Sequence, residues 1–415
     1  MKILYLTAYN YPEQTPSSYL GKNRDDAFYA QGWETLTYTP IPSRGVNDTI
    51  RKEYSKVKKI QTLHNGHSKI IRFNLYREGK NPLLRALRYF ILCIKLFNRG
   101  IFKKEVSDCN VMFVSSTPPI MGATAALVKK CRYIPFIYNL QDIFPDSLVG
   151  TGMAKKNGLL WKIGRKIEDF TYRNADKIIV ISQDFKKNIM AKGVPEEKIE
   201  VIYNWVDEQA VVDVPRTENK LFDKYELDRS KFYITYCGNI GLTQNMDMLM
   251  DVAEEMATEI PNVHFVLIGD GADKARVVEM VKERNITNVT LLPFQPYENI
   301  SDVFSLGDIS IVISKPGVGE NSVPSKTWSI MSASRPVLIN FDENELKEIV
   351  VNHECGIFTK AGDKQSFKEA IKRLYENPSL CLIYGQNGRK FVMENLTKEG
   401  ETQKYVDVIK SVVNN

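Results

Sequence analysis

The feature that most constrains this chain is the alternation of short apolar runs with segments of helical periodicity. In the first half, apolar runs of strand length lie at residues 3–6, 111–114, 136–139, 177–181 and 201–203. Helical patterns separate several of these runs, at 19–31, 121–130 and 160–174. Strands that alternate with helices form parallel sheets covered on both faces. The pattern therefore predicts an α/β fold.

The alternation occurs twice. After a polar stretch at 208–231, apolar runs recur at 233–237, 263–268, 289–292, 309–313 and 336–339. At 415 residues the chain also exceeds the roughly 250–300 residues that a single hydrophobic core supports. We therefore expect two doubly wound, Rossmann-like domains, residues 1–204 and 205–395, joined near 204–230 and followed by an amphipathic helix in residues 396–415.

Cysteine and histidine usage argues against a metal or disulfide framework. The six cysteines are scattered with no Cys-x-x-Cys pair, which favours reduced thiols. Of the four histidines, His64 and His67 are the one close pair, and the Asn-Gly between them is typical of a hairpin turn. We therefore expect no metal site. Residues 1–9 are interpreted as a buried strand, because no small-residue cleavage site follows them.

Charge is concentrated at one end of the chain. Residues 1–104 hold 19 Lys and Arg against 7 Asp and Glu, whereas the remaining residues hold 37 against 43. The basic part includes an apolar helical pattern at 81–99 that carries Arg85, Arg88, Lys95 and Arg99. Residues 51–104 either lie on an anionic membrane surface or contain a core helix with a basic exposed face. No aromatic-basic repeat or recognition motif accompanies the charge, so nucleic acid is not expected as a partner.

Loops that follow strands are the candidate ligand sites. Open parallel sheets bind ligands beyond the carboxyl ends of their strands, so two such sheets are expected to share a cleft. Gly238 and Gly241 follow the run 233–237 and precede a helical pattern at 248–257. Such glycines let backbone N–H groups approach an anion, and the helix offers its positive end. A tight turn without a ligand is the alternative, and it is the favoured interpretation of the Gly-Asp-Gly at 269–271.

The loop after the run 309–313 follows the same logic. Lys315-Pro-Gly-Val-Gly319 cannot form a helix, and Ser322-Val-Pro-Ser325 looks like an N-terminal cap for a helix at 326–333. Free N–H groups beside Lys326 suit a diphosphate, and Glu320 suits hydroxyl groups. A ligand with both features is a nucleotide sugar. We expect the loop to be bare so that its backbone reaches the phosphates.

These motifs resemble the retaining GT-B glycosyltransferases of the glycosyltransferase 4 family. The resemblance covers most of the chain, through residues 1–18, 138–146, 175–183, 193–207, 238–247, 268–271 and 320–336. Val323-Pro-Ser-Lys326 and Ser332-Ala-Ser-Arg-Pro336 are similar to the subgroup that builds bacterial O-antigen and capsule, including fucosamine and amino-sugar transferases. The resemblance implies two Rossmann-like domains facing across a cleft, with the C-terminal helix crossing back to the first domain.

The resemblance also implies a reaction. A sugar would move from a UDP or GDP donor, with UDP favoured, to a lipid-linked saccharide at the cytoplasmic face of the membrane, without a cofactor or a metal. Lys326 would offset charge on the leaving diphosphate, and Glu320 would hold hydroxyls of the donor sugar. The donor-binding residues would be Gly238, Asn239, Gly241, Ser322, Pro324, Ser325 and Lys326.

Two departures from the family pattern bear on the chemistry. Ser329 stands where many members have a second glutamate. Asn239 and Asn245 stand where a phosphate-binding Arg and Lys are usual. Two other functions therefore stay open. One is a nucleotide-sugar epimerase of the same fold, which needs acid and base groups flanking the sugar. The other is a catalytically silent partner that binds a sugar nucleotide.

The acceptor side is expected in the first domain. Asp142 directly follows the run 136–139, so it would point into the cleft and orient the acceptor hydroxyl or steady charge on the sugar. A helix cap or a loop salt bridge is the alternative role. The remaining acceptor-side candidates are polar residues after the first and second strands, where ordinary turns are the alternative: Ser17, Ser18, Ser115 and Thr117.

Overall fold

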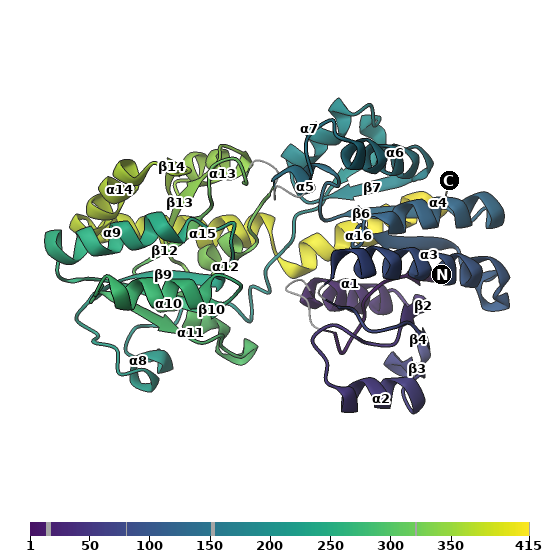
Figure 1. Cartoon of the computed structure of the whole chain (residues 1–415), viewed down its shortest axis with the longest axis horizontal. Helices are drawn as coiled ribbons and strands as arrows, with labels where there is room; N and C mark the ends of the chain where they lie inside the picture. The colour runs from purple at the N-terminus through teal and green to yellow at the C-terminus, as the bar shows by residue number, and fades with distance from the viewer. Residues whose placement is uncertain (14–17, 80, 151–153, 320–321, 415) are drawn as a thin grey trace. The chain divides into compact units, whose positions relative to one another are not determined.

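The structure, a computed structural model, describes residues 1–13, 18–79, 81–150, 154–319 and 322–414. It divides into two compact units, drawn in Figure 1. Unit 1 comprises Met1–Tyr203 with Glu401–Asn415, and unit 2 comprises Asn204–Gly400. The chain therefore passes between the units twice, and its last residues belong to the unit in which it began.

Unit 1 is built on an eight-stranded sheet in the order β3-β4-β2-β1-β5-β6-β7-β8. Neighbouring strands pair in parallel except β3 and β4, which pair antiparallel. The strands are β1 (Lys2–Leu6), β2 (Glu34–Pro40), β3 (Ile60–Leu63), β4 (Ser68–Phe73), β5 (Val111–Ser115), β6 (Phe136–Leu140), β7 (Lys177–Val180) and β8 (Ile199–Val201).

Helices cover both faces of this sheet. Leu4 and Val114 point to the face covered by α3, α4 and α6, and they share its buried core. Phe113 points the other way, where the guanidinium of Arg24 in α1 lies 4.4 Å from its ring centroid and Tyr405 of α16 packs beside it. Side chains alternate across a strand, so successive residues serve opposite layers. The helices are α1 (Ser18–Ala30), α2 (Asp48–Lys56), α3 (Pro82–Phe102), α4 (Ile120–Arg132), α5 (Asp146–Gly150), α6 (Leu159–Asn174), α7 (Gln183–Ala191) and α16 (Lys398–Val413).

Unit 2 holds a six-stranded sheet that is parallel throughout, in the order β11-β10-β9-β12-β13-β14. The helices α9 and α14 pack on one face, and α11, α12 and α15 pack on the other. The strands are β9 (Phe232–Asn239), β10 (Val263–Asp270), β11 (Val289–Leu292), β12 (Ile309–Ile313), β13 (Val337–Phe341) and β14 (Gly356–Lys360). The helices are α8 (Lys220–Lys224), α9 (Met246–Glu259), α10 (Lys274–Glu283), α11 (Ile300–Ser305), α12 (Lys326–Ser332), α13 (Glu345–Asn352), α14 (Lys364–Glu376) and α15 (Pro378–Asn395).

The polar stretch 208–231, where the sequence places the join between domains, belongs to unit 2. Leu221 and Phe222 of α8 are buried, and the Arg216 guanidinium lies 2.5 Å from the Asp308 carboxylate. The sequence of this stretch is polar because many of its contacts are ion pairs and hydrogen bonds to backbone groups, in addition to apolar contacts.

The prediction of two Rossmann-like α/β domains is confirmed. The hairpin predicted between His64 and His67 is also confirmed, since β3 and β4 pair antiparallel around it and Asn65 has a φ of 54°. His64 stacks on Tyr29, and Nδ1 of His67 lies 2.9 Å from the Trp33 carbonyl oxygen. Each histidine thus has its own partner. Across the described ranges, no helix combines the length and the apolar character needed to cross a bilayer.

Candidate functional site

The strand order of unit 2 reverses between β9 and β12. The strands β10 and β11 lie on one side of β9, whereas β12, β13 and β14 lie on the other. The two central strands pair over two residues, Ile234 with Ile309 and Thr235 with Ser310, so β9 extends beyond its pairing with β12. In open α/β sheets, ligands bind beyond the carboxyl ends of strands at such a switch point. The loops after β9 and β12 are therefore the candidate donor site.

Lys326, the first residue of α12, brings these two loops together. Its Nζ lies 3.7 Å from the centroid of the Tyr236 ring in β9. Its Cδ and Nζ lie 3.9 Å from the point where a side chain on Gly238 would begin. The backbone also joins the loops, because the Lys315 N–H donates to the Thr243 carbonyl oxygen at 2.8 Å. The structure thus places Lys326 beside Gly238, two residues that are far apart in the sequence.

The ammonium group of Lys326 is poorly solvated. The residue as a whole is half-buried, but its charged end is enclosed by protein, and this burial lowers the pKa of Lys326 to about 7. The neighbouring Cys237 acts on this pKa in the opposite direction. Desolvation disfavours the charged form of a lysine, and a cation–π contact with Tyr236 restores part of that loss. A bound anion would restore more of it.

The glycine loop at the end of β9 contains two exposed residues and one buried glycine that is hydrogen-bonded within the protein. Gly238 is exposed with a φ of 130°, and Asn239 beside it is exposed as well. Gly241 is buried, and its N–H already donates to Oε1 of Gln244 at 3.0 Å. Gly238 and Asn239 are therefore exposed at the end of β9, although both pair with β10 and the Asn239 carbonyl oxygen accepts from the Tyr236 hydroxyl at 2.6 Å. The N–H of Gly241, which was predicted to meet an anion, is already used within the protein.

The bare loop at 314–319 has a different cause from the predicted one. The N–H groups of Gly317 and Gly319 donate to the two carboxylate oxygens of Asp342, at 3.0 and 2.7 Å. Gly317 has a φ of 77°, and a Cβ on Gly319 would lie 2.7 Å from Cδ1 of Phe341. The glycines are needed for the turn and for packing, so the expectation that their N–H groups meet phosphate is wrong.

The segment between this loop and α12 differs in part from the predicted cap. Ser325 occupies the N-cap position and is exposed, but its side chain makes no capping hydrogen bond. The Ser322 hydroxyl donates to the Gly319 carbonyl oxygen at 3.3 Å, and the Pro324 carbonyl oxygen accepts from the Thr327 N–H at 2.9 Å. Ser329 lies in α12 and is partly exposed. Glu320 lies outside the described residues.

Unit 1 has its own switch point, between β1 and β5. Ser115 is the last residue of β5, and Thr117 is exposed in the turn that follows. Ser18 begins α1, and Ser17 lies outside the described residues. Sequence reasoning missed the role of Ser116, which is buried and accepts the Gln141 N–H at 3.0 Å through its hydroxyl oxygen, tying the loop after β5 to the loop after β6.

Asp142 lies in that second loop, two residues after the end of β6. The residue is exposed, yet partial enclosure of its carboxyl group raises the pKa of Asp142 above its ordinary value, while a hydrogen bond with Ser147 opposes the change. Asp146, four residues later, is an ion-pair residue, with its carboxylate 2.8 Å from Nζ of Lys192. The alternative of a loop salt bridge therefore describes Asp146. Asp142 hydrogen-bonds to Ser147 in the first turn of α5, so the alternative of a helix cap stays open for it.

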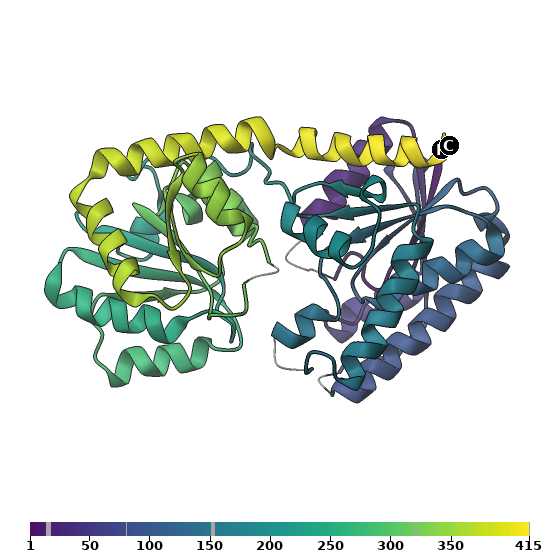
Figure 2. The same cartoon turned by 90° about the horizontal axis from the view of Figure 1, so that it is seen from above.

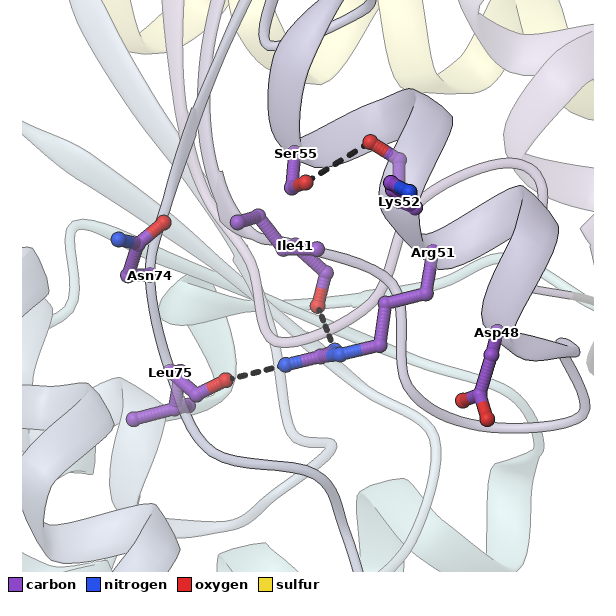
Figure 3. Close-up of a pocket in the computed structure, with 7 residues that line it drawn as sticks. All are labelled: Ile41, Asp48, Arg51, Lys52, Ser55, Asn74 and Leu75. Atoms are coloured by element: carbon purple, nitrogen blue, oxygen red, sulfur yellow. Dashed lines mark hydrogen bonds between the residues drawn. The ribbon is translucent and has the colours of Figure 1, made fainter.

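A separate pocket of about 370 Å³ lies in unit 1, and no predicted site residue lines it (Figure 3). Its lining includes Arg51, whose guanidinium donates to the carbonyl oxygens of Ile41 and Leu75 at 3.2 and 2.7 Å. These bonds use the cation to fasten backbone segments together. The remaining lining residues are Asp48, Lys52, Ser55 and Asn74.

Two further observations complete the site. Among the residues that the structure describes, no three His, Cys, Asp or Glu side chains lie close enough to hold a metal ion. Tyr236, which the sequence analysis did not single out, supports the Lys326 ammonium. The signal was present, because Tyr236 and Gly238 are two apart in a strand and so share one face of the sheet.

Known families match both halves of the chain. Residues 30–210 match the family described as Glycosyltransferase Family 4, and residues 217–391 match the family described as Glycosyl transferases group 1. The first range contains the loops after β5 and β6, and the second contains the loops after β9 and β12, whereas β1 lies outside both ranges.

Individual proteins are similar over part or all of the chain. The probable glycosyltransferase WbjE of Pseudomonas aeruginosa is 22% identical over 347 residues, which cover 82% of this chain and 84% of that protein. The putative colanic acid biosynthesis glycosyl transferase WcaI of Escherichia coli K12 is 28% identical over 210 residues, about half of each chain (49% and 50%). The solved structure of HepE from Anabaena in complex with UDP shares the fold, with a TM-score of 0.74 at 16% identity over 99% of this chain and 100% of that chain.

Proposed function

We propose that the chain, a glycosyltransferase with a Glycosyltransferase Family 4 domain and a group 1 domain, transfers a sugar from a nucleotide-diphosphate sugar to a lipid-linked saccharide in the synthesis of a bacterial surface polysaccharide. The colanic acid biosynthesis for which WcaI is named supports the pathway, and the UDP in the HepE structure supports a UDP-linked donor. The amino-sugar subgroup and retention of the anomeric configuration are part of the same proposal.

The observation that carries the proposal is the position of Lys326 at the switch point of unit 2. A lysine whose charge is poorly solvated, beside an exposed glycine at the end of a strand, is suited to a multiply charged anion. The first turn of α9 adds the positive end of a helix dipole at the same edge of the sheet. In this arrangement the donor diphosphate lies against Lys326, Gly238 and Asn239, with Ser325 at its margin.

The chemistry that these residues supply is stabilisation of the leaving group. The acceptor hydroxyl oxygen forms a bond to the anomeric carbon, the bond from that carbon to the diphosphate oxygen breaks, and the hydroxyl proton passes to a phosphate oxygen. In many enzymes, fixed donors that meet a developing negative charge make the greatest single contribution to catalysis. Lys326 has that role here. Glu320 holds hydroxyls of the donor sugar, and Asp142 orients the acceptor hydroxyl.

A calorimetric titration with UDP-hexoses, UDP-N-acetylhexosamines, GDP-sugars and free nucleotides tests the donor assignment. We expect one UDP-sugar to bind more tightly than the others and to yield free UDP when a lipid-linked saccharide is supplied. A changed sugar with no acceptor present would instead show an epimerase. Binding without turnover in the presence of the native acceptor would show a silent binding partner.

Donor affinity is expected to fall as the pH rises above about 7. In the free protein the pKa of Lys326 is about 7, below its ordinary value, and the diphosphate raises it by favouring the charged form. Binding above pH 7 therefore takes up a proton, and the affinity falls by up to about tenfold per pH unit until the pKa of the complex is reached. Below pH 7 the affinity is expected to be constant. A UDP-sugar titrated between pH 6 and 9 measures this, since its diphosphate diester keeps its charge throughout.

The matched variant for this prediction is Lys326→Arg. Arginine stays charged at every pH in that range, so its donor affinity should be flat. A slope that persists in Lys326→Arg would assign the proton to another group and contradict the role given to Lys326.

Asp142→Asn is expected to lower kcat by about 100-fold, because an oriented carboxylate is lost from the reacting hydroxyl. The KM for the donor should be nearly unchanged, since Asp142 belongs to unit 1 and the proposed donor site to unit 2. Asp146→Asn is the control. It breaks the ion pair with Lys192, so we expect lower thermal stability with kcat retained. Equal loss of kcat in both variants would show that Asp142 has a structural role only.

A further inference from the structure

The exposed surface of α3 is apolar, in contrast to the basic surface that the sequence suggests. Arg88 is fully buried, where its guanidinium donates to the Ser43 hydroxyl at 3.0 Å and to the Tyr76 carbonyl oxygen at 3.1 Å. Lys95 donates to the Asn74 carbonyl oxygen at 2.8 Å, and the guanidinium of Arg99 packs 4.0 Å from the centroid of the Phe73 ring. Much of the positive charge of this helix is therefore directed to the unit's own loops and core.

Apolar side chains take the outward positions instead. Four of them recur at the spacing i, i+4, i+7 and i+11, which forms one stripe about 16 Å long at 1.5 Å per residue. Their exposed fractions range from 45% to 81%. Leu84 lies beside this stripe and is also exposed. The outward apolar residues of α3 are therefore Leu83, Leu84, Leu87, Phe90 and Ile94. A helix that packs on one side in water normally turns polar residues outward, so this stripe requires an explanation.

The start of α6 continues the same kind of surface. Leu159, Leu160 and Ile163 are 78%, 52% and 48% exposed. Four exposed lysines surround them, at Lys155, Lys156, Lys162 and Lys166. The helix α4 lies between α3 and α6 and packs on both, and the three helices run alongside one another in unit 1 (Figure 2). We call the eight outward apolar residues of α3 and α6 the α3–α6 face.

The charge around this face has a single sign. Residues 79–104 contain seven Lys and Arg with no Asp or Glu, and residues 147–167 contain five with none. The whole of α4, residues 120–132, also lacks an acidic residue. Acidic residues lie at the edges of this region, where Glu78 is 3.4 Å from Arg85 and Asp169 pairs with Arg165. These pairs do not include the four lysines in and before the start of α6. An apolar stripe bordered by lysines is complementary to an anionic lipid surface.

The position of the face fits the same surface. A helix that links two parallel strands begins at the edge of the sheet where the first strand ends. The helices α3 and α6 follow β4 and β6, so both begin at the edge that also carries Thr117 and Asp142. All of these apolar residues except Ile94 lie in the first half of their helix. The face therefore lies at the end of unit 1 that holds its acceptor-side residues.

We propose that the α3–α6 face lies on an anionic bilayer, with its apolar side chains at the boundary between headgroups and acyl chains and its lysines against lipid phosphates. The inference rests on the proposed function, because membrane binding would bring the enzyme to a lipid-linked acceptor in that bilayer. The sequence predicts a membrane contact somewhere within residues 51–104. The proposal assigns that contact to α3 and adds the start of α6. A second copy of the chain is disfavoured as the occupant, because a two-fold interface would place each group of lysines opposite like charge.

Vesicle sedimentation with the full chain tests the proposal. The chain should bind vesicles of phosphatidylcholine with phosphatidylglycerol, bind vesicles of phosphatidylcholine alone about tenfold more weakly, and lose affinity as salt rises. Two neutral variants remove the apolar contact, Leu87→Gln with Phe90→Gln on α3 and Leu160→Gln with Ile163→Gln on α6. Each should weaken binding by about tenfold, and their combination should abolish it.

The matched control is Leu382→Gln with Ile383→Gln on α15, where the side chains are 62% and 49% exposed. This control should bind vesicles as the unchanged chain does. All these positions are exposed, so the fold is expected to persist, and thermal denaturation followed by circular dichroism checks it for each variant. No vesicle binding by the unchanged chain, or equal binding by the combined variant, would overturn the proposal. The proposal would also be overturned if the unchanged chain were a dimer and the variants were monomers that bind vesicles equally well. Vesicle binding is measured without donor, so its failure is distinct from a failure of the proposed reaction.

Discussion

Lys326→Ala is expected to lower kcat/KM by about 10²–10³-fold, the effect of removing one fixed donor from a developing oxyanion. Donor binding in the titration should weaken in the same variant, because the diphosphate loses the ammonium group that lies beside Gly238. The fold should be unaffected. The lysine is buried at a cost to its charged form, so its removal relieves an unfavourable interaction.

Lys347→Ala is the matched control for this variant. Lys347 also lies over an aromatic ring in unit 2, with its Nζ 5.9 Å from the Phe358 centroid, and it pairs with Glu343 at 2.9 Å on the surface. Its removal should change neither donor binding nor turnover. A Lys326→Ala protein that binds donor as tightly as the unchanged chain would remove Lys326 from the site.

Gly269→Ala is expected to destabilise unit 2 by about 3 kcal/mol and to weaken donor binding with it. Gly269 pairs with Gly238 across β10 and β9. A Cβ at Gly269 would overlap the Gly238 carbonyl oxygen and lie 2.9 Å from its carbonyl carbon. Backbone atoms of a neighbouring strand cannot rotate aside, so the strands must separate where β9 meets the proposed diphosphate. Urea denaturation followed by the donor titration measures both effects.

Gly317→Ala is the comparison that isolates the close approach. Gly317 has a φ of 77°, and no atom lies within 4 Å of the place where its Cβ would be. The expected cost is that of a left-handed backbone alone, about 1 kcal/mol. Equal destabilisation by the two substitutions would show that strand spacing at Gly238 is not the cause.

The fold was predictable where strands are apolar throughout, and less so where they are not. The central strands read as continuous apolar runs because both of their faces are buried. By contrast, β2 alternates apolar residues with Thr35, Thr37 and Thr39, all of them buried. Its polar members suggest a half-exposed strand or a loop, although every residue of the strand after Glu34 lies inside. The strand β4 is hard to recognise from the sequence for the same reason, because it contains Arg72, which is only 2% exposed.

The site was predictable in its parts and not in its assembly. The sequence indicates Gly238, Lys326 and the bare loop as separate features. Contacts between strands decide what each feature does, and these join residues far apart in the chain. Asp342, which follows β13, occupies the N–H groups of Gly317 and Gly319. Tyr236 and Gly238 share a face of β9 and receive the lysine from α12. For this reason the glycine-rich loop at 314–319 is structural, whereas Gly238 and Lys326 form the candidate donor site.

A crystal structure of the chain with a UDP-sugar, UDP-glucose as the first probe, tests the central claim most directly. The account predicts the diphosphate at the end of β9, with a phosphate oxygen within hydrogen-bonding distance of Lys326 Nζ and the other phosphate near Gly238 and Asn239. A diphosphate bound elsewhere, for instance against Lys52 in the pocket of unit 1, with Lys326 still resting on Tyr236, would contradict it.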